Sequence, residues 1–335
     1  MSRKNLIVGQ SGGPTAVINS SLYGVVSEGM RHPEAIEHVY GMINGIEGFL
    51  NGTVLDFAEA LPGEKLDGLK VTPGAYLGSC RYKLPESLED PVYPRLFKKF
   101  EEMNIGWFFY IGGNDSMDTV SKLSRYAAQT GSDIRILGEP KTIDNDLIHT
   151  DHTPGFGSAA KYIGASTKEV IRDALGLTYK KEMITIIEVM GRNAGWLTGA
   201  TALAKTEECE GPDLIYLPEV PFDIDAFLSK IKDLLKEKKS IIVAVSEGIK
   251  LPDGRYVCEL SGGGDYVDAF GHKQLTGTAA YLANFLGAEI GCKTRAVEFS
   301  TLQRSASHMA SRVDINEAFM VGGAAVKAAD EGDSG

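Results

Sequence analysis

Long apolar runs, clusters of basic residues and closely spaced cysteines are all missing from this sequence, and each absence excludes a class of protein. No run of about 18 apolar residues occurs, so we expect no membrane-spanning segment. The formal net charge is −11 and Lys and Arg form no block, which argues against a nucleic-acid partner. The four cysteines show no Cys-x-x-Cys spacing, which predicts reduced thiols instead of a disulfide framework or zinc site.

Two common nucleotide-binding patterns are also missing or out of context. The P-loop pattern Gly-x-x-x-x-Gly-Lys-Ser/Thr does not occur. Residues 155–160 fit the dinucleotide pattern Gly-x-Gly-x-x-Ala, but polar residues precede them where an apolar strand is required. We interpret residues 155–160 as the start of a helix.

The size and composition are those of a soluble protein with two domains. A chain of 335 residues exceeds what one hydrophobic core usually supports. The hydrophobic content of 43% and charged content of 24% are ordinary for globular proteins. Residues 1–5 lead directly into a short apolar segment, too short for the core of a signal peptide. We therefore expect a cytoplasmic protein.

Short apolar segments alternate with longer segments of helical periodicity. The predicted strands are residues 6–9, 107–111, 134–137, 183–189, 214–217, 241–245 and 296–299. The predicted helices are residues 16–30, 117–128, 158–175, 194–205, 224–236, 274–286 and 316–329. This alternation predicts an α/β fold of two doubly wound lobes with mainly parallel sheets and an active-site cleft between the lobes. We expect residues 1–140, rejoined by a segment near 295–335, to form one lobe and residues 141–294 the other.

Glycine pairs follow two of the predicted strands, where function gathers in such folds. Gly12 and Gly13 precede the first helix, and Gly112 and Gly113 precede the helix that begins near Ser116. Glycine lets the backbone approach a ligand closely, and the N–H groups of a helix N-terminus can bind an anion. Tight strand-to-helix turns would explain either pair alone. Two pairs favour a phosphate-binding site.

Two carboxylates lie two residues apart in the segment Pro-Lys-Thr-Ile-Asp-Asn-Asp at 140–146. In an extended loop, Asp144 and Asp146 would point to the same side. One carboxylate can accept a proton from a hydroxyl while the other helps to hold a metal, as phosphoryl transfer requires. An Asx-rich turn is the alternative interpretation. Because the glycine pairs also occur, we favour phosphoryl transfer over an Asx-rich turn.

Charged residues also follow or border strands in the second half of the chain. Arg192, Arg295 and Arg304 have the planar geometry that suits phosphate, although a lone Arg is usually part of a surface ion pair. Glu247 ends a wholly apolar strand, where it can accept a hydrogen bond from a sugar hydroxyl. His308 lies near this group, and we interpret it as structural.

Taken together and in order, these segments resemble phosphofructokinases over nearly the whole chain. The motifs are Gly-Gly-Pro-Thr at 12–15, Leu-Gly-Ser-Cys-Arg at 77–81, Gly-Gly-Asn-Asp-Ser at 112–116, Pro-Lys-Thr-Ile-Asp-Asn-Asp at 140–146, Glu-Val-Met-Gly-Arg at 188–192, Ser-Glu-Gly at 246–248 and Gln-Arg at 303–304. The resemblance implies phosphorylation of fructose 6-phosphate on its 1-hydroxyl, Mg²⁺ as cofactor, and a homodimer or homotetramer. It also implies that the first lobe binds the phosphoryl donor and the second the sugar phosphate.

The resemblance further implies a role for each matching position. Asp144 is expected to take the proton from the sugar hydroxyl, and the other expected catalytic residues are Lys141, Asp115 and Arg192. The expected substrate contacts are Thr142, Ile143, Asp144, Met190, Gly191, Arg192, Glu247, Arg295, Thr301 and Arg304, with Arg295 supplied by a neighbouring subunit. The expected donor contacts are Gly13, Arg81, Gly113, Asp115 and Lys141. The expected metal ligands are Asn114 and Asp146.

Asp115 and Lys141 bear on which phosphoryl donor is used. Family members that use ATP typically have Gly at both positions, whereas members that use pyrophosphate resemble this chain. Asp115 would fill the space of a nucleotide's α-phosphate and repel its charge, while Lys141 could neutralise the transferred phosphoryl group. We therefore expect a readily reversible pyrophosphate-dependent enzyme. The alternatives are an ATP-dependent phosphofructokinase and a non-catalytic sugar-phosphate sensor.

The chain departs from the family pattern at four places. Asn114 stands where the family usually has a metal-binding Asp, Met183 where many members have a substrate-binding Arg, and Thr301 where His or Tyr is usual. The family normally continues for some tens of residues beyond position 335, so we expect a truncated C-terminus. Allosteric regulation, the dominant direction of the reaction, and the acceptance of other sugar phosphates such as sedoheptulose 7-phosphate are not predictable from these motifs.

Overall fold

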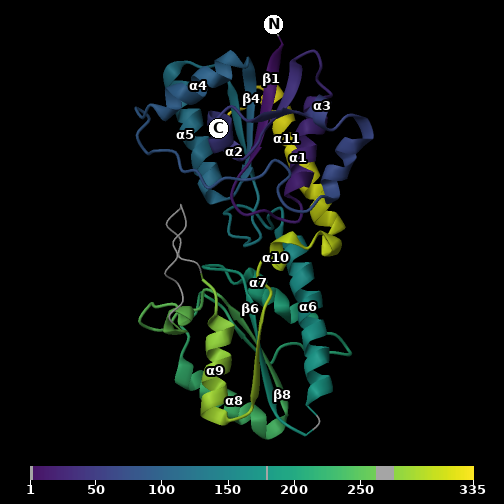
Figure 1. Cartoon of the computed structure of the whole chain (residues 1–335), viewed down its shortest axis with the longest axis vertical. Coiled ribbons are helices and arrows are strands. Elements are labelled where there is room, and N and C mark those ends of the chain that lie inside the picture. The colour runs from purple at the N-terminus through teal and green to yellow at the C-terminus, as the bar shows by residue number, and fades with distance from the viewer. Residues whose placement is uncertain (1–2, 179, 262–274) are drawn as a thin grey trace. The chain divides into compact units, whose positions relative to one another are not determined.

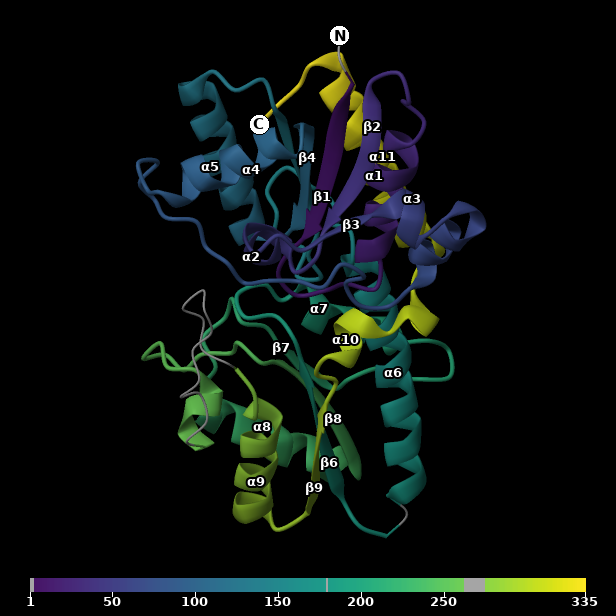
Figure 2. The ribbon, with the colours of Figure 1, turned by 45° about the horizontal axis from the view of Figure 1, so that its top comes forward.

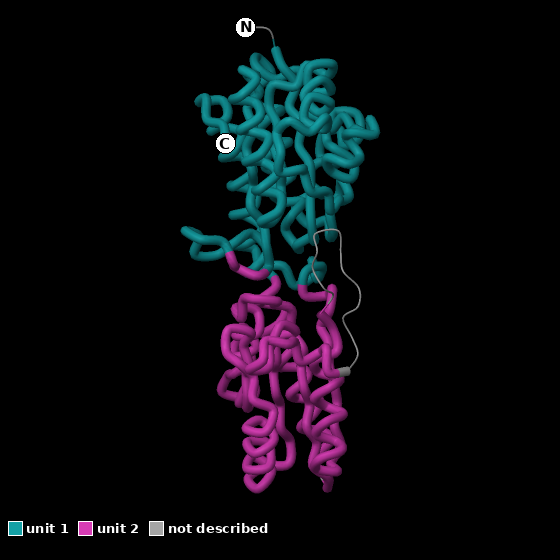
Figure 3. Tube along the Cα trace, turned by 90° about the vertical axis from the view of Figure 1, so that its left-hand side faces the viewer, with its two compact units in different colours: residues 1–143, 147–158, 304–335 teal, residues 144–146, 159–303 magenta. Residues whose placement is uncertain are grey.

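A computed structural model of the chain describes residues 3–178, 180–261 and 275–335 (Figure 1, Figure 2). Its residues divide into two compact units, and each is described by itself. Unit 1 consists of residues 1–143, 147–158 and 304–335, drawn in teal in Figure 3. Unit 2, drawn in magenta, consists of residues 144–146 and 159–303.

Unit 1 is built on a five-stranded sheet with the order β3-β2-β1-β4-β5. The strands are β1 Lys4–Gln10, β2 Ile36–Met42, β3 Val54–Asp56, β4 Ile105–Gly112 and β5 Arg135–Pro140. All neighbouring strands pair in parallel except β2 and β3, which are antiparallel. Every residue of β4 is buried, as expected for a central parallel strand that helices cover on both faces.

Helices cover both faces of this sheet. The helical elements of unit 1 and its borders are α1 Ile18–Gly29, α2 Gly45–Leu50, α3 Phe57–Ala60, η1 Gly63–Val71, α4 Val92–Glu102, α5 Asn114–Thr130, α10 Leu302–Ser305, η4 Ser307–Met309 and α11 Arg312–Glu331. Alternate residues of β1 belong to different cores: Ile7 packs in a cluster with α2, α4 and α5, whereas Leu6 and Val8 pack in a cluster with α1 and α11. Figure 2 shows these two groups of helices on opposite sides of the sheet.

The C-terminal helix α11 packs against α1 through glycine. An ideal Cβ on Gly24 of α1 would lie 2.2 Å from the carbonyl oxygen of Phe319, and one on Gly322 of α11 would lie 2.2 Å from that of Ser21. Ser20 Oγ also donates a hydrogen bond of 2.7 Å to the carbonyl oxygen of Ile315. Because the two backbones approach so closely, any larger residue at Gly24 or Gly322 would separate the helices.

Unit 2 is built on a four-stranded parallel sheet with the order β7-β8-β6-β9. The strands are β6 Met183–Val189, β7 Leu214–Tyr216, β8 Ser240–Ser246 and β9 Lys293–Glu298. The helical elements are α6 Phe156–Leu177, which begins in unit 1, α7 Trp196–Gly199, η2 Ala200–Ala204, α8 Ile224–Glu237, η3 Val257–Ser261 and α9 Thr278–Ile290. Both central strands, β6 and β8, are buried along their whole length.

The predicted α/β class with mainly parallel sheets is confirmed, and the individual elements differ in part. Strands β2 and β3 and helices α2 and α4 were not predicted. The helix expected at 194–205 is a short α-helix followed by a 3₁₀ helix. The first residue of the helix expected at 274–286, Gln274, lies outside the described residues. In the described ranges, none of the helices has both the length and the apolar character needed to cross a bilayer.

The division into units differs from the expected boundaries of the lobes. Residues 141–143 belong to unit 1 because the N–H of Lys141 donates a hydrogen bond of 2.9 Å to the carbonyl oxygen of Gly112 at the end of β4. Residues 295–303 belong to unit 2, since β9 pairs with β6. The cleft between two lobes and the ligand assigned to each lobe stay predictions.

The carboxyl group of Glu139, on β5, is buried without compensation. Its side chain is fully buried, and neither oxygen has a hydrogen-bond partner among the described residues. The group lies next to α11, since an ideal Cβ on Gly322 would be 3.1 Å from Glu139 Oε2. Burial raises the pKa of Glu139 well above its ordinary value, which favours the neutral acid.

We expect Glu139→Leu to stabilise the protein by about 1–3 kcal/mol at pH 8, because it removes an unpaired buried polar group. Because the pKa of Glu139 is higher in the folded chain, the contribution of this group to stability is most favourable below the unfolded pKa, near 4.5, and is lost as the pH rises. Urea denaturation at several pH values measures both effects. Glu139→Gln is the control, since it removes the titration but keeps a polar group. Equal stability of wild type and the Leu variant at every pH would contradict the prediction.

Candidate active site

The first candidate group lies at the carboxyl ends of β1, β4 and β5 in unit 1. Strand β1 lies between β2 and β4, so the chain leaves the sheet in opposite directions from β1 and β4. Such a switch point is where open α/β sheets bind ligands. Loop 11–13 follows β1, Gly113 follows β4 and Lys141 follows β5. The sheet order therefore brings both glycine pairs and Lys141 to one edge.

Lys141 joins the ends of these three strands. Its side chain is 4% exposed, and Nζ donates a hydrogen bond of 2.6 Å to the carbonyl oxygen of Gly13. An ideal Cβ on Gly12, which has φ +74°, would lie 3.3 Å from the same nitrogen. With its backbone bonded to Gly112, Lys141 places a cation directly beneath the glycine loop.

The segment that carries Arg81 is attached to the same loop. Ser79 Oγ donates a hydrogen bond of 2.6 Å to the carbonyl oxygen of Gly12. The N–H of Gly12 in turn donates a hydrogen bond of 3.2 Å to the carbonyl oxygen of Cys80. Gly78 has φ +72°, and an ideal Cβ there would lie 2.2 Å from Asn44 Oδ1. Arg81 follows Cys80 directly and is exposed.

Helix α5 begins at the same edge. Gly113 is its N-cap residue, and Asn114 and Asp115 form its first turn. Asn114 is exposed and Asp115 is half-buried. The helix N-terminus carries a partial positive charge, which favours an anion or carboxylate there. The structure thus gathers the segments of all five predicted donor contacts, namely those of Gly13, Arg81, Gly113, Asp115 and Lys141, within unit 1.

Residues 147–155 hold the beginning of segment 140–146, which carries both carboxylates. The N–H of Thr142 donates a hydrogen bond of 3.2 Å to the carbonyl oxygen of Pro154. Thr153 Oγ1 donates a hydrogen bond of 2.7 Å to the carbonyl oxygen of Thr142. Ile143 is buried, and Asn145 has φ 55°, as is common for Asn in a turn. The chain therefore bends at Asn145, between Asp144 and Asp146. This bend is compatible with a role of the two carboxylates in phosphoryl transfer.

The second candidate group lies at the carboxyl ends of β6 and β8 in unit 2. The N–H of Gly191 donates a hydrogen bond of 3.4 Å to Glu247 Oε1, and the N–H of Glu247 donates one of 2.9 Å to the carbonyl oxygen of Val189. Gly248 follows, and an ideal Cβ there would lie 2.0 Å from the carbonyl oxygen of Arg192. The two loops after these strands are therefore locked together through backbone contacts.

The electrostatics of Glu247 show which charges surround it. Burial raises its pKa to about 8, and the N–H of Gly191 opposes that rise. The negative charges of Glu188 and Asp144 raise the pKa further, whereas the guanidinium of Arg192 lowers it. Asp144, Arg192 and Glu247, three of the predicted site residues, are thus close enough to interact within unit 2. At neutral pH the carboxyl group of Glu247 is mainly neutral and can donate as well as accept a hydrogen bond.

The remaining three predicted residues are Arg304, Arg295 and Thr301. Arg304 belongs to unit 1, where an ideal Cβ on Gly13 would lie 2.8 Å from its Nη1. Arg295 lies early in β9, and its Nη1 is 2.9 Å from Oδ2 of Asp173. Thr301 is exposed just before α10. That Arg295 contacts the substrate of a neighbouring subunit stays a prediction.

Sequence reasoning missed two buried polar residues that shape the second group. Gln303 is 2% exposed, and its Oε1 accepts a hydrogen bond of 3.0 Å from the N–H of Met190. Ser246 is fully buried; its Oγ donates to the carbonyl oxygen of Gly191 and accepts a hydrogen bond of 3.0 Å from the N–H of Gly248. Both residues stand inside the quoted motifs, which was the available signal.

The predicted metal ligands belong to different units, with Asn114 in unit 1 and Asp146 in unit 2. Both side chains are exposed and offer an oxygen ligand. Within the part of the chain that the structure describes, no group of three or more His, Cys, Asp or Glu side chains could hold a metal. Mg²⁺ is commonly bound by one or two carboxylates together with substrate phosphates. The amide oxygen of Asn114 and the carboxylate of Asp146 are each suitable as one such ligand, and their joint binding of one ion stays a prediction.

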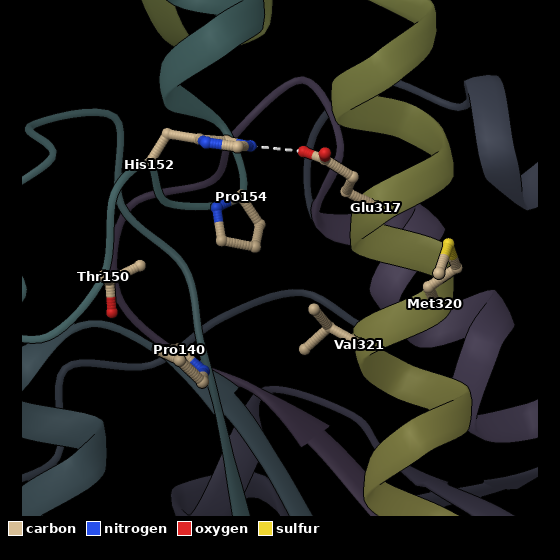
Figure 4. Close-up of a pocket in the computed structure, with 7 residues that line it drawn as sticks. All are labelled: Pro140, Thr150, His152, Pro154, Glu317, Met320 and Val321. Carbon is tan, nitrogen blue, oxygen red and sulfur yellow. Dashed lines mark hydrogen bonds and ion pairs between the residues drawn. The ribbon is translucent and has the colours of Figure 1, made fainter.

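A separate cavity of about 310 Å³ in unit 1 contains none of the predicted site residues. Its lining residues are Pro140, Thr150, His152, Pro154, Glu317, Met320 and Val321 (Figure 4). His152 and Glu317 form an ion pair in its wall, and this hydrogen bond raises the pKa of His152. Pro140 begins segment 140–146 and Thr150 lies shortly after it, so the cavity lies beside both ends of that segment.

Comparison with known proteins gives concordant results. The family model described as phosphofructokinase matches residues 5–329. A pyrophosphate–fructose 6-phosphate 1-phosphotransferase of Halomonas elongata is 40% identical, covering 99% of this chain and 78% of the relative. A crystal structure of pyrophosphate-dependent phosphofructokinase from Nitrosospira multiformis has a TM-score of 0.86 at 36% identity, covering 99% and 78%. One from Marinobacter aquaeolei has a TM-score of 0.86 at 38% identity, covering 99% and 77%.

We expect Gly248→Ala to lower the melting temperature by about 5 °C or more, because the added Cβ would meet the carbonyl oxygen of Arg192 at 2.0 Å. Gly199→Ala is the matched control in the same unit, since an ideal Cβ there meets nothing within 4 Å. Differential scanning calorimetry of both variants measures the effect. A Gly248 variant as stable as the Gly199 variant would show that the two loops are not packed as described.

Proposed function

The chain belongs to the phosphofructokinase family, and we propose that it transfers a phosphoryl group reversibly from pyrophosphate to the 1-hydroxyl of fructose 6-phosphate. The products are fructose 1,6-bisphosphate and phosphate. The observation that carries the choice of donor is the buried ammonium of Lys141, which is 2.6 Å from the carbonyl oxygen of Gly13. Relatives named for pyrophosphate at 40% identity support the same choice.

On the donor side, local charge and space favour pyrophosphate. The ammonium of Lys141 lies at loop 11–13, and Arg81 follows the segment that is hydrogen-bonded to Gly12, so both supply cations to the donor side. Asp115 occupies the first turn of α5. Its carboxylate would meet the α-phosphate of a nucleotide, whereas pyrophosphate has no group in that position. The donor contacts therefore bind two phosphoryl groups and exclude a third.

On the acceptor side, Arg192, Glu247 and Asp144 divide the recognition and the chemistry. The guanidinium of Arg192 can bind the 6-phosphate, and the largely neutral Glu247 can hydrogen-bond sugar hydroxyls. Asp144 is the proposed base that accepts the proton of the 1-hydroxyl as the oxygen attacks the phosphoryl group. Lys141 then stabilises the charge that develops on the leaving phosphate.

Magnesium is the proposed cofactor, held by Asn114 and Asp146 together with oxygens of pyrophosphate. It would neutralise part of the donor's charge during phosphoryl transfer. An amide at position 114 gives the protein ligands one negative charge fewer than a carboxylate would. A homodimer or homotetramer in the cytoplasm, in which Arg295 reaches a neighbouring subunit's site, completes the proposal.

The donor assignment predicts rapid formation of fructose 1,6-bisphosphate with magnesium pyrophosphate and little with magnesium ATP. Asp115→Gly should then admit ATP, because it removes the side chain that meets the α-phosphate. Initial rates with both donors, measured on wild type and variant, test this. Strong ATP activity of wild type with none from pyrophosphate would refute the assignment, and a variant without any gain in ATP binding would refute the steric reason.

Asp144 and Asp146 should fail in different ways. We expect Asp144→Asn to lower kcat about 10²- to 10⁴-fold with little change in the KM for pyrophosphate, because it removes the base. Asp146→Asn should instead raise the Mg²⁺ concentration needed for half-maximal rate. Steady-state rates across a Mg²⁺ series distinguish the two. If wild type binds fructose 6-phosphate but shows no turnover, the protein is a sensor and the proposal is wrong.

A further inference from the structure

Lys122, on α5, is a buried cation with three oxygen partners. The residue is 1% exposed, and its Nζ donates a hydrogen bond of 3.1 Å to the carbonyl oxygen of Leu84. The same nitrogen lies 2.7 Å from Glu86 Oε1 and 2.7 Å from Asp118 Oδ2. A Lys is rarely buried to this extent unless it is paired. Its contacts with Leu84 and Glu86 therefore join α5 to the chain around residues 84–86, whereas Asp118 lies on α5 itself.

The contacts of Lys122 fix one end of a short segment, residues 79–86, whose other end is bonded to the glycine loop. At the first end, Ser79 Oγ donates to the carbonyl oxygen of Gly12 at 2.6 Å. At the second end, Lys122 is joined by Tyr93, whose hydroxyl donates a hydrogen bond of 2.5 Å to the carbonyl oxygen of Pro85. Exposed Arg81 lies between these two attachments. The position of Arg81 relative to loop 11–13 thus depends on both of them.

Lys122 also lies on the same helix as Asp115, one of the proposed donor-site residues. Asp115, Asp118 and Lys122 are spaced three and four residues apart, so they lie on one face of the helix. Asp115 is the residue proposed to exclude a nucleotide. The face of α5 that begins at the donor site therefore continues to the contact between Lys122 and segment 79–86.

Stability alone is a poor explanation for a charge in this place. A buried ammonium loses its hydration, and apolar residues of similar volume often replace buried ion pairs without loss of stability. One partner, Glu86, has a side chain that is 78% exposed, so that ion pair contributes little to folding. What the ammonium adds over a methionine is two directed contacts, to Leu84 and Glu86, that define where segment 79–86 lies.

We propose that Lys122 is a positioning residue for pyrophosphate: it fixes segment 79–86 on α5 and thereby holds Arg81 beside loop 11–13. The proposal rests on the role given to Arg81 under the proposed function. Without the ammonium, Arg81 samples several positions, and the donor loses affinity. The sugar-phosphate side, which unit 2 provides through Arg192 and Glu247, keeps its affinity.

Lys122→Met, which keeps length and apolar contacts, tests the proposal through steady-state kinetics. We expect the KM for pyrophosphate to rise about tenfold and the KM for fructose 6-phosphate to change less than about twofold. Lys122→Arg should restore part of the loss. Lys98→Met is the matched control, because Lys98 forms an exposed ion pair with Glu102 elsewhere in unit 1 and should change neither constant.

Two partner variants keep the test decisive if Lys122→Met does not fold. Glu86→Gln and Asp118→Asn each replace one charged partner of Lys122 with a neutral amide, at a side chain that is 78% or 44% exposed, so both should fold. Each should raise the KM for pyrophosphate by a smaller factor than loss of the ammonium. A KM for pyrophosphate that stays at the wild-type value in both variants, and in any folded Lys122→Met protein, would overturn the proposal.

The double variant Arg81→Ala, Lys122→Met separates this inference from the proposed function. If Lys122 acts through Arg81, the double variant is no worse than Arg81→Ala alone. If the effects of the two substitutions on the KM for pyrophosphate multiply, Lys122 acts by another route and the inference is wrong. If Arg81→Ala alone leaves that KM unchanged, the proposed donor role of Arg81 has failed instead.

Discussion

The hydrogen bond from Lys141 Nζ to the carbonyl oxygen of Gly13 is the contact on which the donor side depends. It can form because β5 and β1 flank β4 in parallel, which brings the loops after all three strands to one edge. The backbone of Lys141 is bonded to Gly112, so its stem begins at the end of β4 and reaches across to loop 11–13. A cation buried beneath a glycine loop attracts an anion above it, and the sheet order alone sets that geometry.

Close backbone approach is the corresponding constraint in unit 2 and between the helices of unit 1. Gly248 brings the loop after β8 against the carbonyl oxygen of Arg192, and Gly24 brings α1 against α11. In each case the absent Cβ lets backbone groups meet that a side chain would keep apart. The functional residues themselves are long and charged, and small neighbours determine where they lie. Glycines without a reactive side chain thus determine where the charged residues of the candidate site lie.

The central strands and the motifs at their ends were predictable from the sequence, since buried parallel strands are almost continuously apolar. Strand β2 was missed because it is partly exposed, with Glu37 and His38 on its surface. Contacts between distant segments had no local signal. No periodicity indicates that Arg304 lies against Gly13, or that Lys122 meets Leu84. The residue types of the candidate site were thus predictable, while their mutual support depends on tertiary packing.

The two candidate groups differ in the charges that surround their buried titratable residues, Lys141 and Glu247. Around loop 11–13 the chain places Lys141, a buried cation, where a densely charged donor needs compensation. Burial is the main cause of the raised pKa of Glu247, and the negative charges of Glu188 and Asp144 raise it further, while Arg192 opposes them. A neutral carboxyl group can exchange hydrogen bonds with hydroxyl groups without adding negative charge beside Arg192. Under the proposed function, these charges suit pyrophosphate to the first group and a sugar phosphate to the second.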